Sequence, residues 1–105
     1  MSYTVDLQKI ADELDFDLED IEMLMEVFLE SSKDSLDELK GAIDSNDLET
    51  LFRSAHSIKG SAANLTLMEI SDLAKEIEHS AKEQKDIDYQ ANYEKLKSLI
   101  EALTA

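Results

Sequence analysis

The feature that most constrains the fold of this chain is its near lack of residues that interrupt helices. Its 105 residues include no proline and only two glycines, Gly41 and Gly60. β-Sandwiches and β-barrels join many short strands through tight turns, which depend on glycine and proline. Apolar residues recur instead every three or four positions along most of the chain, as on the buried face of an amphipathic helix. The sequence therefore predicts an all-α protein.

The spacing of apolar residues separates the chain into amphipathic segments. The first is short, from about Thr4 to Leu14. The second begins after Asp17, a residue suited to capping a helix, and its apolar spacing stays in phase across the polar residues 31–35. This continuity indicates one long helix rather than two. Its expected inward stripe consists of Ile21, Leu24, Met25, Phe28, Leu29, Leu36, Leu39 and Ile43.

Three further helices are expected, and short polar stretches, 45–47 and 82–88, precede the third and the fifth segments. Thr66 and Glu69 have the spacing of a capping box, which predicts that the fourth helix starts there. Connections this short place neighbouring helices antiparallel. We predict one domain, residues 1–105, folded as an antiparallel four-helix bundle with a short extra N-terminal helix. The apolar side of the third helix is expected to contain Leu48, Leu51, Phe52, Ala55, Ile58, Ala62 and Leu65.

Composition excludes several classes of function. The formal net charge of -15 would repel nucleic-acid phosphates and anionic membrane surfaces, so we expect neither as a partner. Without cysteine the chain has no disulfide, no cysteine-based zinc site and no thiol nucleophile. No apolar run is long enough to span a bilayer, and the first residues lack the basic and apolar regions of a secretion signal. We therefore expect a cytoplasmic protein, and a monomer.

His56 is where the sequence departs from a generic bundle. On a wheel with about 100° per residue it points roughly 120° away from the apolar stripe, so its imidazole should reach solvent. Gly60 follows one turn later and Ala63 one turn after that, which leaves the surface beyond His56 nearly bare of side chains. A glycine inside a helix costs roughly 1 kcal/mol relative to alanine. Its position beside His56 indicates a need for open space, through which another backbone can approach.

The charges around His56 also differ from those of the rest of the chain. Residues 50–68 contain no Asp or Glu, whereas Arg53 lies three residues before His56 and Lys59 three residues after it. Both cations can lean toward the imidazole at this spacing. An exposed imidazole with flanking cations is suited to attack phosphorus and then to hold a phosphoryl group. The alternative is an ordinary surface histidine between solvated charges.

Glu78 is a candidate for orienting the imidazole. One ring nitrogen attacks only when the other carries the proton, and a hydrogen-bond acceptor would fix that tautomer. If the chain turns between the third and fourth helices near Leu65 and Thr66, Glu78 lies at the level of His56. We expect Glu78 to accept this hydrogen bond, with an ordinary exposed glutamate as the alternative.

The motif Arg53-x-x-His56-x-Ile58-Lys59-Gly60-Ser61-Ala62 resembles the signature of bacterial histidine-containing phosphotransfer (HPt) domains, which are helical bundles of multistep two-component phosphorelays. The resemblance covers most of the chain, apart from the first fifteen residues and the last helix. It implies that His56 is the phosphoacceptor, through Nε2, and that Lys59 and Gly60 occupy the accessory and clearance positions. The family usually has glycine where this chain has Thr66, a departure that the predicted capping box would explain.

The resemblance also implies a function. We expect a phosphoryl carrier rather than an enzyme with its own ATP site, in line with the lack of a glycine-rich nucleotide loop. The expected partners are response-regulator receiver domains and a hybrid sensor histidine kinase. No cofactor is expected on this chain, and Mg²⁺ is expected on the receiver. The alternative is an interaction module that docks a receiver or kinase without carrying phosphate.

Other constellations are weaker candidates. Glu76-x-x-His79 matches half of a di-iron bundle motif, but the second half is missing, so no metal site is expected. The serines near His56 lack an acidic partner that would orient a catalytic triad. Three methionines are expected to pack in the core or at its edge: Met23, Met25 and Met68.

Overall fold

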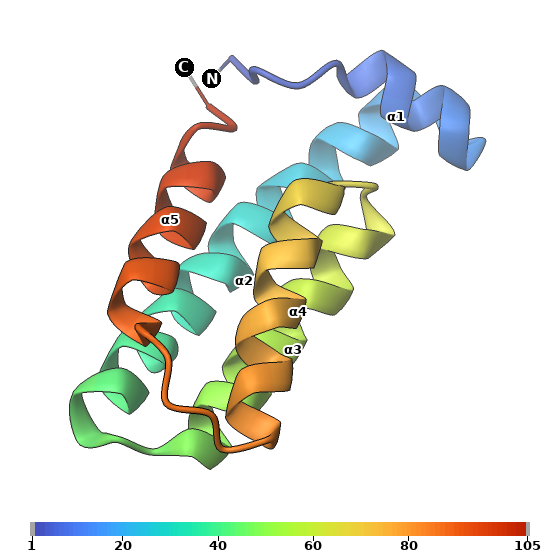
Figure 1. Cartoon of the computed structure of the whole chain (residues 1–105). Helices are drawn as coiled ribbons and strands as arrows, with labels where there is room; N and C mark the ends of the chain where they lie inside the picture. The colour runs from blue at the N-terminus through green and yellow to red at the C-terminus, as the bar shows by residue number, and fades with distance from the viewer. Residues whose placement is uncertain (1, 105) are drawn as a thin grey trace.

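A computed structural model describes residues 2–104 of the chain, which fold into five helices (Figure 1). The predicted fold is confirmed, because the first helix is short and the four helices that follow it form a bundle. The short helix packs against the one that follows it. The helices are α1 (Leu7–Leu14), α2 (Leu18–Ser45), α3 (Leu48–Asn64), α4 (Met68–Lys82) and α5 (Tyr89–Glu101).

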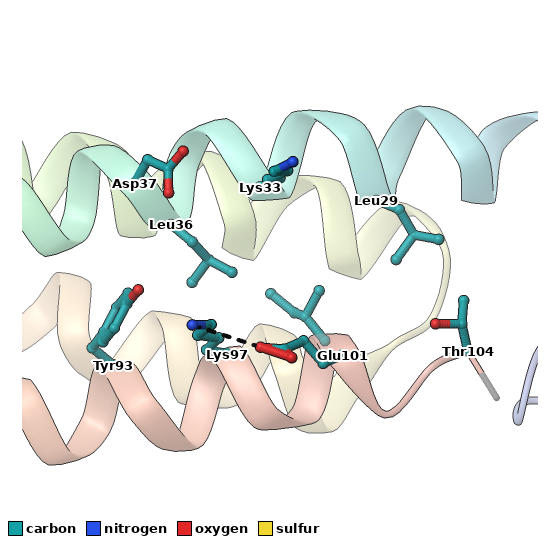
Figure 2. Close-up of a pocket in the computed structure, with 9 residues that line it drawn as sticks. Leu29, Lys33, Leu36, Asp37, Tyr93, Lys97, Glu101 and Thr104 are labelled. Atoms are coloured by element: carbon teal, nitrogen blue, oxygen red, sulfur yellow. Dashed lines mark ion pairs between the residues drawn. The ribbon is translucent and has the colours of Figure 1, made fainter.

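The four long helices contact one another in a ring. Helix α3 packs against α2 and α4, and α5 packs against the same two helices. The α3/α4 and α2/α5 seams therefore lie on opposite sides of the bundle. A cavity of about 410 Å³ lies in the α2/α5 seam, where Figure 2 shows Leu36 of α2 facing α5 and an ion pair between Lys97 and Glu101. His56 lies on α3, outside this cavity.

The apolar stripes that the sequence predicts form the core, with one exception on α2. Leu24 was expected to face inward, but 39% of its surface is exposed. It lines a hollow of about 170 Å³ between α2 and α3, where the facing α3 side chains are Ser61 and Asn64. These small polar side chains do not cover Leu24. Fully buried large side chains include Ile21, Met25, Leu39, Leu51, Ile58, Ile77 and Leu96.

The N-terminal end of the chain differs from the expected helix. Helix α1 begins at Leu7 rather than near Thr4, because the Asp6 side chain accepts a hydrogen bond from the backbone of Lys9 and caps the helix. The backbone N–H of Thr4 instead donates to the carbonyl of Leu103 at 2.8 Å. Helix α2 is continuous across its polar patch, as predicted, although the side chain of Asp17 makes no capping hydrogen bond.

The predicted capping box at Thr66 is wrong. Thr66 has φ 58°, in the left-handed region, whereas an N-cap residue has an extended backbone. The residue that precedes α4 is Leu67, and it makes no side-chain capping bond. Thr66 thus adopts the conformation that glycine takes most readily, so the departure from the family pattern places a β-branched residue in a strained backbone conformation.

None of the described helices has both the length and the apolar character that crossing a bilayer requires.

Candidate functional site

His56 lies on the surface of α3, with 61% of its side chain exposed. This position agrees with the flank predicted from the helical wheel. Side chains on a helix lean toward its N-terminus, so the imidazole lies toward the residue four positions earlier, which is Phe52. The two rings are stacked, with centroids 6.0 Å apart and an interplanar angle of 14°. The apolar spacing predicted Phe52 only as a core residue, although its four-residue spacing from His56 also indicated a contact between the two rings.

Glu78 of α4 lies between His56 and Lys59. One carboxylate oxygen, Oε2, is 3.0 Å from Nδ1 of His56, and Nζ of Lys59 donates to Oε1 at 2.9 Å. Only 15% of the Glu78 side chain is exposed. Burial acts to raise the pKa of Glu78, but the hydrogen bonds from Lys59 and His56 outweigh it, so the pKa lies below its ordinary value. Glu78 is therefore a carboxylate at neutral pH.

The contact with Glu78 defines which nitrogen of the imidazole is available. A carboxylate accepts hydrogen bonds and donates none, so in the neutral ring the proton resides on Nδ1. The lone pair then lies on Nε2, the nitrogen without a protein partner among the described residues. An exposed imidazole in this tautomer is a nucleophile. His56 and Glu78, which are expected from the sequence to form a hydrogen bond, therefore lie in contact in the structure.

The two cations near His56 have partners of their own. Lys59 is bound to Glu78, and its backbone carbonyl accepts a hydrogen bond from Ser71 of α4 at 3.1 Å. Arg53 donates to Oγ1 of Thr50 at 3.4 Å, one turn toward the start of α3. The stretch without acidic residues is therefore not a purely positive site in space, because α4 supplies the carboxylate of Glu78. The phosphoryl-supporting roles of Lys59 and Arg53 stay predictions.

Gly60 and Ala63 are exposed on α3, on the C-terminal side of His56. A Cβ atom placed on Gly60 would meet no heavy atom within 4 Å other than its immediate helix neighbours. The bundle would therefore accommodate a side chain at this position. The open space above Gly60 is consistent with a clearance role and is not needed for packing.

The weaker candidates are also located. His79 is exposed on α4, and its Nε2 lies 3.5 Å from Glu83. Ser54 is buried and donates to the carbonyl of Thr50, whereas Ser57 is exposed. Within residues 2–104, no three His, Asp or Glu side chains converge as a metal site would require.

Two of the three methionines were placed wrongly. Met25 is buried as expected, but Met23 is 64% exposed and Met68 is 51% exposed. Met23 belongs to a group of exposed apolar side chains on the N-terminal half of α2, together with Leu24 and Val27. We refer to Met23, Leu24 and Val27 as the α2 patch. Leu24 and Val27 line the hollow that Ser61 borders on α3, and Ser61 directly follows Gly60.

Helix α3 presents an exposed histidine whose Nδ1 contacts a carboxylate of the neighbouring helix, an arrangement suited to nucleophilic attack through Nε2. A comparison with protein families is in agreement. Residues 23–105 match the model of the Hpt domain, and this range covers most of the chain. The chain belongs to the Hpt family, the histidine-containing phosphotransfer domains.

A solved structure has the same fold. Histidine-containing phosphotransfer protein B (HptB) from Pseudomonas aeruginosa PAO1 superposes with a TM-score of 0.79 and 23% sequence identity. The match covers 92% of this chain and 82% of HptB. At this identity the likeness shows the fold alone. A search of curated protein sequences found no match.

Proposed function

We propose that this chain is a phosphoryl carrier of a multistep two-component phosphorelay, in which His56 receives a phosphoryl group from a receiver-domain aspartate and passes it to another. The observation that carries the proposal is the 3.0 Å contact between Nδ1 of His56 and Glu78. This contact leaves Nε2 as the nucleophilic nitrogen on an exposed ring. Family membership supports the same conclusion, because the motif around His56 lies inside the matched residues 23–105.

In this transfer no general base has to remove a proton from His56, because Nε2 already carries the lone pair. The lone pair of Nε2 forms a bond to phosphorus while the bond from phosphorus to the aspartyl oxygen of the receiver breaks, and the aspartate leaves as a carboxylate. The ring then carries a phosphoryl group on Nε2 and a proton on Nδ1, so it bears a positive charge. The carboxylate of Glu78 stabilises this charge without taking the proton. The reverse reaction regenerates the neutral ring.

Lys59 and the receiver supply the remaining electrostatic stabilisation in this proposal. Phosphoryl transfer depends mostly on positioning and on neutralising the charge of the equatorial oxygens. Mg²⁺ bound by the receiver would supply most of that neutralisation. Lys59 is 28% exposed and shares the carboxylate of Glu78 with His56, so it is the cation that we expect to contact the phosphoryl oxygens. Arg53 would first have to leave Thr50.

The α2 patch is the proposed docking surface for the receiver. Its members are large apolar side chains in water, with Val27 56% exposed. On α3, the exposed residues Ser57 and Gly60 are small, and Gly60 lies one turn from His56. A receiver resting on the patch can therefore reach across α3 to His56. Receiver domains, including that of a hybrid sensor histidine kinase, are the proposed partners, and the carrier acts as a cytoplasmic monomer.

The test is phosphotransfer from a phosphorylated receiver to the purified chain. We expect a label on the protein that is labile in acid and stable in alkali, and we expect it to vanish in His56→Gln. His79→Gln is the matched control, because it removes the other histidine, and it should keep the label. A label that persists in His56→Gln would refute the assignment. Receiver binding without any label in the wild type would show an interaction module instead.

A further inference from the structure

The stacking of Phe52 on His56 assigns Phe52 a role that the hydrogen bond to Glu78 cannot fill. One hydrogen bond fixes the distance and direction at Nδ1, but the ring can still rotate about the line between Nδ1 and the carboxylate. The nearly parallel Phe52 ring, at 14° and 6.0 Å between centroids, restricts that rotation. The two contacts together define the plane of the imidazole and the direction of Nε2.

Phe52 is itself held in place, so it is able to define a plane. It is half-buried and packs against the core. With Leu48 and Ala81 it lines a hollow where the start of α3 meets the end of α4. His56 is 61% exposed and has no other aromatic neighbour within the described part of the chain. The less mobile ring thus supports the more mobile one.

The surroundings of the imidazole are asymmetric along α3. Phe52 lies four residues before His56 and stacks on it, while Gly60 lies four residues after and carries no side chain. A partner is therefore blocked on the N-terminal side and admitted on the C-terminal side, where the α2 patch also lies next to Ser61. The stacking on Phe52 sets the direction of Nε2, and the phosphoryl donor can approach over Gly60.

We infer that Phe52 is a positioning residue for phosphotransfer, which fixes the plane of the His56 ring so that Nε2 meets the receiver's phosphoryl group in line. This inference rests on the proposed function. It concerns orientation toward a macromolecular donor and not the intrinsic reactivity of the nitrogen. A small donor that diffuses freely can approach Nε2 from many directions, so it should be insensitive to the ring plane.

The experiment compares two phosphodonors on Phe52→Leu and Phe52→Tyr. We expect Phe52→Leu to slow transfer from a phosphorylated receiver about five- to tenfold at saturating receiver, since small misplacement of a reacting group is costly. Phosphorylation by phosphoramidate should stay within about twofold of wild type, by the same argument. Phe52→Tyr, which keeps the ring, should restore the receiver rate. Leu48→Ala, in the same hollow but away from His56, is the control for altered packing.

A second measurement does not depend on transfer. In the wild type, the carbon-bound ring protons of His56 should show a ring-current shift in NMR spectra, lost in Phe52→Leu and kept in Phe52→Tyr. An unchanged receiver rate or an unchanged shift in Phe52→Leu would overturn the inference. If Phe52→Leu does not fold, Phe52→Met serves with the same expectations. A wild type that takes no label from the receiver, yet shows the shift, would refute the proposed function and not the stacking.

Discussion

Nζ of Lys59 lies 2.9 Å from the carboxylate of Glu78, the same group that binds Nδ1 of His56. One anion thus serves two donors from consecutive turns of α3. A phosphoryl group on Nε2 would offer Lys59 a second anionic partner close to the first. The Lys59–Glu78 pair therefore competes with the contact that Lys59 would make to phosphate.

The first prediction compares the two cations. Lys59→Gln should slow transfer from the receiver about tenfold, because it removes one charged donor from the transition state. Arg53→Gln should change the rate less than about twofold, because its guanidinium is bound to Thr50 rather than to the ring. Single-turnover transfer rates measure both. Equal losses in the two variants would show that Arg53 reaches the phosphoryl group.

The second prediction concerns pH. Since the pKa of Glu78 is lower in the folded protein than its ordinary value of 4.5, ionised Glu78 contributes stability above that value. The contribution is lost as pH falls through the folded-state pKa. Wild type should exceed Glu78→Gln in free energy of unfolding by about 1 kcal/mol at neutral pH. The difference should shrink progressively as the pH falls below 4.5. Glu76→Gln, an exposed change on the same helix, controls for the loss of one charge.

Denaturant titrations of these variants at a series of pH values provide the measurement. A difference between wild type and Glu78→Gln that is the same at every pH would contradict the assigned charge state of Glu78.

The third prediction uses the chain's two glycines as a matched pair. Both Gly41 and Gly60 are exposed within helices and have open space where a Cβ would be. Glutamine at either position should stabilise the fold by about 0.5 kcal/mol through helix propensity. Only Gly60→Gln should slow receiver transfer, by at least about tenfold, because its side chain enters the approach path. If Gly41→Gln slows transfer equally, clearance at Gly60 is not the cause.

The fourth prediction concerns docking. Val27→Asp should raise the half-saturating concentration of the receiver about tenfold, since it puts a charge into an apolar contact. Stability should change little, because 56% of Val27 is exposed. Ala91→Asp, on the exposed face of α5, adds the same charge far from the α2 patch and should leave binding unchanged. Calorimetric titration of each variant with the receiver measures the affinity. Equal losses of affinity in Val27→Asp and Ala91→Asp would argue against the α2 patch as the docking site.

The fifth prediction concerns Thr66, whose φ of 58° is unfavourable for a β-branched residue. Thr66→Gly should stabilise the protein by about 1 kcal/mol and raise Tm by a few degrees. Thr66→Ala should remain close to wild type, because alanine also has a Cβ. Thermal unfolding measures the effect. Destabilisation by glycine would show that Thr66 makes a contribution other than its backbone conformation.

Periodicity was sufficient to predict the helices and most of the core, because the buried face of a helix repeats in the sequence itself. It failed where a neighbouring element decides the outcome. Leu24 has the right phase for the stripe, yet the α3 residues opposite it are too small to cover it. Thr66 and Glu69 have the right spacing for a cap, yet the chain leaves α3 through a left-handed residue.

The site was predictable to the extent that it depends on helix spacing. His56, Gly60 and Lys59 lie on one α3 surface for that reason. The position of Glu78 beside His56 was predictable because the two residues are about equally far from the turn that joins α3 to α4. The pairing of Lys59 with Glu78 did not follow, because charge position in sequence does not give charge position in space. The stack of Phe52 on His56 was missed because an aromatic residue at a core position can also reach the surface.

Helix α2 contacts α1, α3 and α5, so the α2 patch lies on the helix with the most neighbours in the bundle. Its backbone is already ordered before any partner arrives. Association there costs side-chain freedom but little backbone entropy, unlike binding through a loop that must fold on contact. A weak and brief encounter can therefore still be geometrically specific, which would suit the proposed carrier, since it has to release one receiver before it binds the next.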